Sequence, residues 1–228
     1  MNLKIAQKYN FFIIQFFFIF NLNILRESIY ELLHKSFVID INRIIIIEMK
    51  KALLIVDVQN DFCPGGSLGV KDGDKVVEVI NGLMDKFDLV ISSQDWHPEE
   101  TVHFEKWPVH CVAGTSGAEF HPSLNSNNID LRLKKGTDNK DDGYSAFEAT
   151  NINFGEYLNN NRVTTLYICG LTTDYCVKES ALDSISKGIH TYVVTDAIAA
   201  VNAKQGDDKE ALNEMYKSGC ILVESKDI

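Results

Sequence analysis

The stretch Ala52-Leu-Leu-Ile-Val-Asp57 decides the fold, because it is a run of apolar residues with the length of a strand that ends at an acidic residue. A second run, Thr165-Leu-Tyr-Ile-Cys-Gly170, has a similar length and closes on glycine. Continuous apolar strands are typical of parallel sheets that are covered on both faces, because each side chain then meets a protein layer. Both runs therefore predict strands of a mostly parallel sheet.

Helical patterns alternate with further strands around these two runs. Residues 75–86 place apolar side chains at the spacing of a helix, and residues 176–187 and 209–217 are also predicted helices. Further strands are predicted at residues 89–92, 129–134, 191–195 and 220–224. Strands that alternate with helices build βαβ units, so the sequence predicts an α/β fold of three layers, αβα, with a mostly parallel central sheet. Residues 49–228 are predicted to form this fold as a single domain.

Composition and charge restrict the class of protein. The chain has 228 residues, of which 45% are hydrophobic and 24% charged, as in an ordinary globular protein. Its 22 Lys and Arg against 32 Asp and Glu give a net charge of −10, which argues against a nucleic-acid partner because such partners favour a basic surface. The five cysteines are odd in number and form no CxxC pair, so we predict a reducing compartment and a cytoplasmic protein.

Residues 1–48 differ from the rest of the chain. Nine of the ten residues at positions 11–20 are apolar, and two lysines precede them. Three interpretations are open: a signal or membrane anchor, a packed apolar extension, or sequence upstream of a true start at Met49. An anchor requires about 20 apolar residues and a cleaved signal requires a small-residue cleavage site, and the run meets neither requirement. We therefore favour upstream sequence, and we expect no membrane partner for residues 49–228.

Reactive side chains follow several of the predicted strands, and parallel sheets bind ligands beyond the carboxyl ends of their strands. Asp57 follows the first strand, and Lys135 continues the inward-facing set of its alternating strand, whereas Lys134 faces solvent. A buried lysine requires an anionic partner, for which Asp57 is the candidate. The pair has two interpretations: part of a catalytic site, or an ion pair that only fixes the strand order.

Cys176 lies between a predicted strand and the start of a predicted helix. A helix N-terminus lowers the pKa of a thiol, because its free N–H groups and partial positive charge favour the thiolate. The same N–H groups can hold an oxyanion, so an acid, a lysine and a thiol at these positions suit covalent catalysis. The alternative is that Cys176 is a small buried hydrophobic residue, which is our interpretation of Cys63, Cys111, Cys169 and Cys220.

A second cluster combines a carboxylate with imidazoles. Asp95 and His97 are two residues apart, so both side chains lie on one face of an extended backbone, and His103 and His110 follow closely. Such ligands suit Zn²⁺, Fe²⁺ or Mn²⁺ with open positions for water or substrate. We predict one divalent metal ion here and leave its identity open; scattered surface histidines are the alternative.

Several motifs follow one another in chain order across residues 49–225. They are Ile55-Val-Asp-Val-Gln-Asn-Asp-Phe-Cys-Pro-Gly-Gly-Ser67, Gln94-Asp-Trp-His-Pro98, Trp107-Pro-Val-His-Cys-Val-Ala-Gly-Thr115, Gly117-Ala-Glu-Phe-His-Pro122, Lys135-Gly136 with Tyr144-Ser-Ala-Phe147, and Gly170-Leu-Thr-Thr-Asp-Tyr-Cys-Val177. Together they resemble the motifs of nicotinamidases, a group within the isochorismatase-like hydrolase superfamily. The resemblance covers the whole predicted domain and none of residues 1–48, and it implies the isochorismatase-like hydrolase fold.

The resemblance implies a catalytic triad of Asp57, Lys135 and Cys176. In that triad Asp57 takes the proton of Cys176, Lys135 stabilises the charges that develop, and the N–H groups of Thr172 and Cys176 hold the oxyanion. The implied reaction is the hydrolysis of nicotinamide to nicotinate and ammonia through a Cys176 thioester, in NAD salvage.

The resemblance also implies the metal ligands. Asp95, His97 and His110 match them, and His103 matches a fourth ligand that occurs in some members only. In this family the metal contacts the pyridine nitrogen of the substrate and orients its ring.

The substrate pocket is implied in the same way. Phe62, Trp107 and Tyr144 match its aromatic walls. Thr172 departs from the family pattern, because many nicotinamidases have alanine there, beside a peptide bond that is cis in the family. Its larger side chain would narrow the pocket and change the range of substrates.

Two other functions stay open: another amidohydrolase of the superfamily that acts on a different small amide, and a non-catalytic binding protein of the same fold. The complete metal set favours a pyridine amide, and the complete catalytic set favours an enzyme. A dinucleotide-dependent oxidoreductase is excluded because no GxGxxG motif follows the first strand. The oligomeric state and the physiological role are open.

Overall fold

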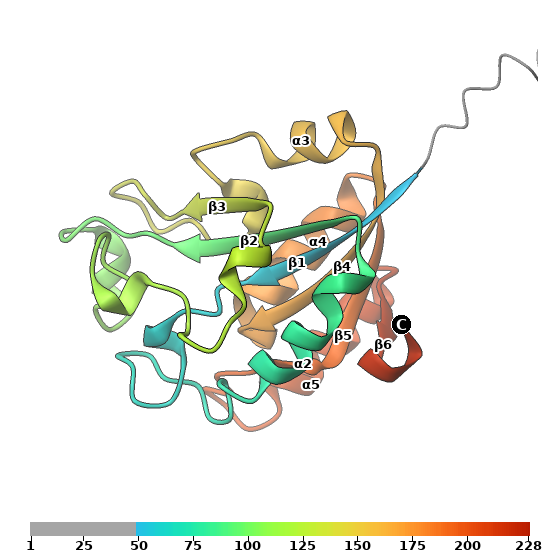
Figure 1. Cartoon of the computed structure of the whole chain (residues 1–228). Coiled ribbons are helices and arrows are strands. Elements are labelled where there is room, and N and C mark those ends of the chain that lie inside the picture. Colours follow the sequence, from blue (N-terminus) through green and yellow to red (C-terminus); the bar gives the residue numbers. More distant parts are fainter. Residues whose placement is uncertain (1–48) are drawn as a thin grey trace, which may run out of the picture. The chain divides into compact units, whose positions relative to one another are not determined.

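The computed structural model describes residues 49–228, so the interpretations of residues 1–48 lie outside the described part of the chain. Six strands form one sheet in the order β3-β2-β1-β4-β5-β6, and every pairing between them is parallel (Figure 1). The strands are β1 (Lys50–Val56), β2 (Leu89–Asp95), β3 (Leu131–Lys135), β4 (Val163–Leu171), β5 (His190–Ala199) and β6 (Ile221–Val223). The predicted α/β class is confirmed.

Within residues 49–228, four α-helices connect the strands. They are α2 (Val76–Leu83), α3 (Phe154–Asn160), α4 (Lys178–Ser186) and α5 (Asp207–Lys217). The sequence did not predict α3. This helix has only seven residues and buries only Phe154 and Leu158, and two apolar positions are too few to show a helical period. No helix among residues 49–228 has both the length and the apolar character that a bilayer crossing requires.

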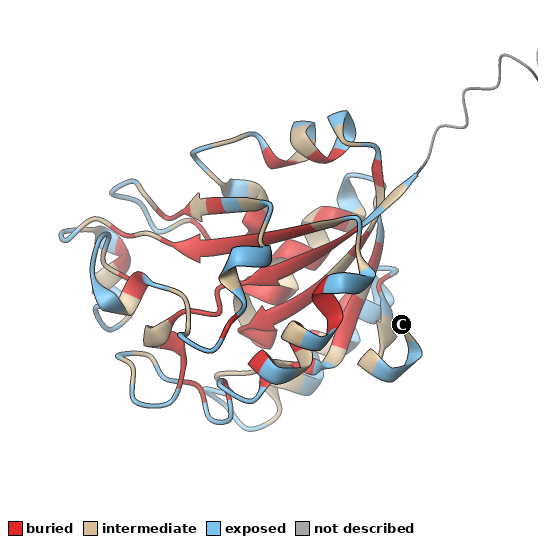
Figure 2. Cartoon of the chain, in the orientation of Figure 1, coloured by how far each residue is buried: buried red, intermediate tan, exposed pale blue. Residues whose placement is uncertain are grey.

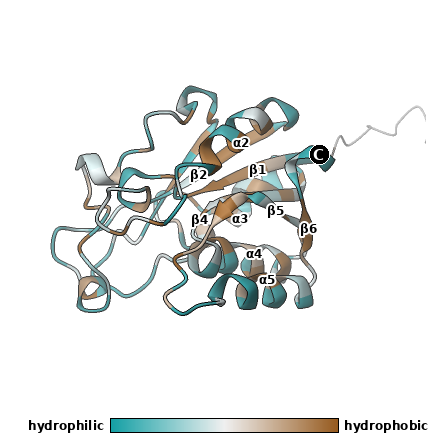
Figure 3. Ribbon diagram, turned by 90° about the horizontal axis from the view of Figure 1, so that it is seen from below, coloured by the Kyte–Doolittle hydropathy of each residue, from teal (hydrophilic) through white to brown (hydrophobic). Residues whose placement is uncertain are grey.

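The side chains of β1 alternate between two cores. Leu54 and Val56 pack on the face that α3, α4 and α5 cover, whereas Leu53 and Ile55 pack on the face that α2 covers. All four side chains are completely buried, and Figure 2 shows β1 and β2 as largely buried strands. Figure 3 shows α2 on one side of the sheet and α4 with α5 on the other. The predicted three layers are confirmed, and they explain why this strand is apolar at consecutive positions.

The strand order reverses between β1 and β4, and this reversal positions the site. β2 and β3 extend the sheet on one side of β1, whereas β4, β5 and β6 extend it on the other. The segments beyond the carboxyl ends of β1 and β4 therefore diverge and leave a crevice between them. Asp57 directly follows β1, and Cys176 lies just beyond β4 in a π-helical turn, η7 (Thr173–Val177).

Candidate active site

Asp57, Lys135 and Cys176 meet at the carboxyl ends of the strands. Lys135 is the last residue of β3 and is completely buried, and its Nζ lies 2.8 Å from Asp57 Oδ2 and 3.5 Å from Cys176 Sγ. It faces inward, as the alternation along its strand predicted. Lys134 points the other way and places its ammonium over the ring of Trp96.

Lys135 has a second anionic partner that sequence analysis missed. Asp95 is the last residue of β2 and lies in register with Lys135, whose Nζ donates hydrogen bonds to Asp95 Oδ1 and, at 2.6 Å, to the Gly143 carbonyl. Burial alone would lower the pKa of Lys135. The carboxylates of Asp57 and Asp95 outweigh burial and raise this pKa well above its ordinary value, so the lysine is a permanent cation.

Asp57 is a buried carboxylate that can receive a proton. Its Oδ1 accepts a hydrogen bond from the Ser93 hydroxyl at 2.8 Å, whereas Oδ2 faces Lys135 without an aligned hydrogen bond from any described residue. Burial raises the pKa of Asp57 to about 6, although the charge of Lys135 opposes this rise. Asp57 is therefore ionised at neutral pH, and its raised pKa makes it a stronger base than an exposed aspartate.

Cys176 differs from the prediction in two respects. It lies inside η7 rather than at the start of an α-helix, since α4 begins at Lys178, and the Val177 N–H donates to the Thr172 carbonyl at 3.0 Å in the five-residue spacing of a π-turn. The pKa of its thiol is raised well above the ordinary value, because burial and the charges of Asp57 and Asp95 outweigh the opposing effect of Lys135. The prediction of a lowered pKa is wrong. The resting group is a thiol, so it requires a base before it can attack.

Three histidines, His97, His103 and His110, each place Nδ1 within hydrogen-bond distance of an oxygen atom. In His97, Nδ1 lies 2.9 Å from the Gly136 carbonyl; in His110, it lies 2.7 Å from the Pro108 carbonyl; in His103, it lies 3.1 Å from Asp141 Oδ1. These three oxygens only accept hydrogen bonds, so each Nδ1 carries a proton, and in the neutral ring this leaves the lone pair on Nε2. The sequence grouped these histidines correctly, but it gave no sign of the residues that set their tautomers.

The lone pairs fit a metal ion. Ligand nitrogens of the three histidines lie within 4.8 Å of one another, and Asp95 Oδ2 lies 3.7 Å from His97 Nε2 and 3.8 Å from His110 Nε2. His97 Nε2 is buried and has no hydrogen-bond partner among the described residues. Burial lowers the pKa of His103 to about 4 and lowers that of His110, so both are neutral at neutral pH. Neutral imidazoles and a carboxylate are the donor set of a zinc-type site.

The carboxylates of Asp57 and Asp95 and the Cys176 sulfur also lie within 4.8 Å of one another, but this second group differs from the histidine cluster. The Lys135 ammonium contacts all three side chains and is already the cation among them. A metal therefore fits the histidines, with Asp95 shared between the metal ligands and the lysine.

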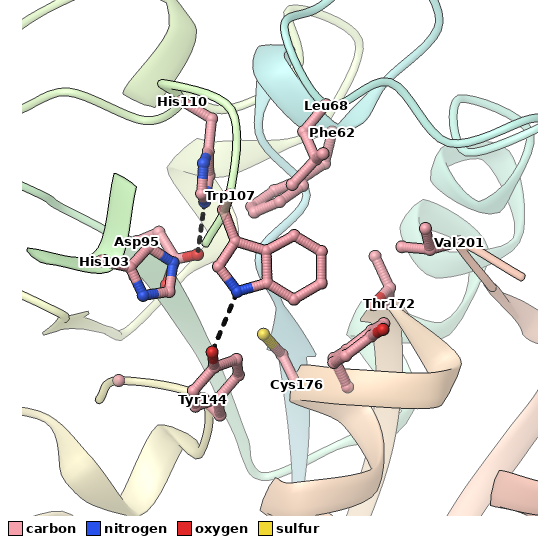
Figure 4. A pocket seen from close by; sticks show the side chains of 12 residues that line it. Phe62, Leu68, Asp95, His103, Trp107, His110, Tyr144, Thr172, Cys176 and Val201 are labelled. Atoms are coloured by element: carbon pink, nitrogen blue, oxygen red, sulfur yellow. Dashed lines mark hydrogen bonds and ion pairs between the residues drawn. The ribbon is translucent and has the colours of Figure 1, made fainter. Parts of the chain in front are cut away.

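A pocket joins the Cys176 thiol to His103 and His110 (Figure 4). Its lining includes the four residues predicted from the resemblance, namely Phe62, Trp107, Tyr144 and Thr172. Leu68, Tyr175 and Val201 also line it and were missed, because as isolated apolar or aromatic residues they carry no sequence signal. Trp107 Nε1 donates to the Tyr144 hydroxyl at 3.0 Å, and the Leu171–Thr172 peptide bond is cis, as the resemblance implied.

Known proteins are similar to this chain in sequence and in architecture. The nicotinamidase of Acinetobacter baylyi is 37% identical over 201 residues, which cover 78% of this chain and 94% of that protein. The pyrazinamidase of Pyrococcus horikoshii, solved in complex with zinc, is 38% identical with a TM-score of 0.70, covering 77% of this chain and 99% of that one. PnC1 of L. infantum, solved in complex with nicotinate, is 32% identical with a TM-score of 0.74, covering 78% and 94% of the respective chains.

A sequence profile of the isochorismatase domain matches residues 51–227, which span β1 to the end of the described sheet. The crevice with its buried acid, lysine and thiol, the apolar pocket and the histidine cluster all lie within this match. The chain belongs to the isochorismatase family of hydrolases and, within that family, is related to the nicotinamidases.

Proposed function

We propose that the protein is a nicotinamidase, which hydrolyses nicotinamide to nicotinate and ammonia and thereby supplies NAD salvage. The observation that supports the proposal is the shared pocket: the Cys176 thiol lines the same apolar pocket as His103 and His110, two members of the histidine cluster. A flat aromatic amide with a ring nitrogen suits this arrangement, because its carboxamide can face the Cys176 thiol while its ring nitrogen faces the histidine cluster. The thiol chemistry and the free cysteines also agree with a cytoplasmic protein.

The first half of the reaction needs a base, a nucleophile and a cation. Asp57 accepts the proton of the Cys176 thiol, and the sulfur forms a bond to the carboxamide carbon. Lys135 stabilises the thiolate and the developing negative charge from 3.5 Å away. The N–H groups of Thr172 and Cys176 receive the oxyanion. Asp57 returns its proton to the amide nitrogen, the carbon–nitrogen bond breaks, and ammonia leaves a thioester on Cys176.

In the second half, water replaces the thiol as the nucleophile. Asp57 accepts a proton from water, the water oxygen bonds to the thioester carbon, and the carbon–sulfur bond breaks to give nicotinic acid, which releases its proton to solvent as nicotinate. The proton on Asp57 passes back to Cys176 and restores the thiol.

The histidine cluster serves substrate orientation in this scheme. Asp95, His97, His103 and His110 would hold one divalent ion, which supplies a Lewis acid for the ring nitrogen when bound. Phe62 and Trp107 flank the ring and exclude water from the thiol. The identity of the ion follows from supply as much as from the ligands, because mixed imidazole and carboxylate sets accept several divalent metals.

The test measures ammonia release by the metal-loaded full chain with nicotinamide and with benzamide, which has the same shape and lacks the ring nitrogen. We expect turnover of nicotinamide, much slower turnover of benzamide, and no detectable turnover after Cys176→Ala. Cys220→Ala is the matched control, because Cys220 is a buried thiol outside the pocket and its loss should leave the rate unchanged.

Two outcomes would redirect the proposal. If a folded, metal-loaded protein releases no ammonia from nicotinamide but does so from another amide through Cys176, it is a different amidohydrolase of the same family. If it binds small amides and hydrolyses none of them, the protein is a binding protein.

A further inference from the structure

Asp141 connects the two halves of the pocket through one carboxylate. Its Oδ1 accepts hydrogen bonds from His103 Nδ1 at 3.1 Å and from the Tyr144 hydroxyl at 2.8 Å. Its Oδ2 accepts from Lys106 Nζ at 2.7 Å. The Tyr144 oxygen in turn accepts from Trp107 Nε1 at 3.0 Å. One histidine of the metal cluster and two aromatic walls of the pocket therefore share a single hydrogen-bonded unit.

His103 differs from the other two histidines in what holds its ring. Backbone carbonyls of Gly136 and Pro108 accept the Nδ1 protons of His97 and His110, and no side-chain substitution removes those carbonyls. The His103 tautomer depends instead on one side chain, that of Asp141. A carboxylate behind an imidazole fixes the ring orientation and raises the basicity of its far nitrogen.

The surroundings of Asp141 make this dependence testable. The carboxylate is 36% exposed, whereas the His103 side chain that it contacts is only 5% exposed. Among the described residues, the Asp141 carboxylate forms an ion pair with Lys106, and its other hydrogen bonds are to His103 and Tyr144, both of which belong to the site. Its removal therefore changes the site more than it changes the core.

We propose that Asp141 is a positioning residue that holds His103 with its Nε2 toward the metal and, through Tyr144, holds Trp107 in the pocket wall. Metal binding through His103 and the placement of Trp107 and Tyr144 in the pocket wall thus depend on the same carboxylate, that of Asp141. The metal-binding half of this inference is independent of the substrate, whereas the pocket-wall half depends on the proposed nicotinamidase function.

The first experiment measures Zn²⁺ affinity by competition with a chelator, using the full chain with Asp141→Ala and Asp141→Asn. We expect Asp141→Ala to weaken Zn²⁺ binding about 10–100-fold, the effect of losing a group that orients a metal ligand. Asp141→Asn keeps one acceptor oxygen and should lose less. Asp138→Asn is the matched control, because Asp138 is on the same loop and its carboxylate pairs with Lys140 and with no other residue in the described part of the chain, so the same charge is lost without a contact to the site.

Thermal unfolding separates positioning from structural support. We expect metal-free Asp141→Ala to unfold at the temperature of the metal-free wild type, while the rise in unfolding temperature on adding Zn²⁺ shrinks. An equal loss of stability with and without Zn²⁺ would mean that Asp141 only supports the fold, and wild-type Zn²⁺ affinity in both variants would also overturn the proposal. If Asp141→Ala does not fold, the Asp141→Asn values decide.

The second experiment tests the wall with nicotinamide at saturating Zn²⁺. We expect Asp141→Ala to raise KM several-fold with a smaller change in kcat, because Cys176, Lys135 and Asp57 do not contact Asp141. An unchanged KM would overturn the role in the wall while leaving the Zn²⁺ result intact. A wild-type protein that does not hydrolyse nicotinamide would instead contradict the proposed function.

Discussion

Asp57 sets the acid limit of the proposed reaction, because only its ionised form can take the proton of Cys176. Burial raises the pKa of Asp57 to about 6. About half of the Asp57 carboxyl is therefore ionised at this pH, ionisation is nearly complete about one pH unit above it, and the ionised fraction falls towards tenfold for each pH unit below it. We expect kcat/KM for nicotinamide to be level near pH 7.5 and to decline with unit slope below about pH 6.

Metal loss is the competing cause of an acid decline, because protons compete for imidazole nitrogens. The profile is therefore measured with protein-bound metal quantified at each pH. A decline that follows metal content, or a rate that stays level to pH 5 with the metal retained, would remove Asp57 as the base.

Lys135 illustrates how far single residues could be interpreted from sequence. Period-two alternation placed Lys135 inward and Lys134 outward, because side-chain direction in a strand is a local property. Its pairing with Asp95 was not foreseeable, because it depends on the register between β2 and β3. Asp141 is harder still: its contact with His103 arises from the path of a loop, for which the sequence has no periodic signal.

At the scale of elements, β1 and β4 approach so closely that one position requires glycine. Gly170 has φ of 107°, and a Cβ there would lie 2.1 Å from the Val56 carbonyl oxygen. Val56 directly precedes Asp57, so any separation of the two strands also moves the proposed base away from the segment that carries the thiol.

We therefore expect Gly170→Ala to lower the free energy of unfolding by about 2–4 kcal/mol, from left-handed strain and the clash with Val56. The midpoint of thermal unfolding should fall by roughly 4–16 °C. Gly82→Ala is the control, because Gly82 lies in α2 and a methyl group added there would meet no atom within 4 Å, so this change should be neutral or stabilising by up to about 1 kcal/mol. Equal stability of both variants would contradict the close approach.

The elements themselves were predictable to different degrees. Strands of continuous apolar character and the helix around Val76–Leu83 follow from patterns that extend over several residues. The segment after β4 was predicted as an α-helix from residue 176, whereas the structure has a π-turn before α4. Helical periodicity does not distinguish a π-turn from the first turn of an α-helix, because the difference is one residue in a short segment.

Across the whole molecule, the histidine cluster links the loop after β2 to the loop after β3. His97, His103 and His110 come from the first of these loops, and Gly136 and Asp141, which hold two of their rings, come from the second. A bound ion would therefore stabilise the folded chain in addition to orienting the substrate. It satisfies a buried nitrogen of His97 that otherwise has no partner among the described residues.

We expect chelation to abolish turnover of nicotinamide and to lower the unfolding temperature, with both restored by Zn²⁺ or Mn²⁺. A free-ion concentration about 1,000 times the dissociation constant contributes about 4 kcal/mol, which is roughly 8–16 °C for a domain of this size. His110→Ala should lose most of this shift, whereas His190→Ala, an exposed histidine outside the cluster, should keep it. Full activity after exhaustive chelation would contradict the assignment of a metal.

The number of residues in the π-turn at Thr173–Val177 determines the direction in which the Cys176 side chain points. Removing one residue from this turn would restore the ordinary helical repeat and rotate Cys176 by roughly 100° about the helix axis, away from Lys135. In evolutionary terms, this segment should accept exchanges of side chain while rejecting insertions and deletions. The length of this segment should therefore vary less among related enzymes than the identity of any of its residues except the cysteine.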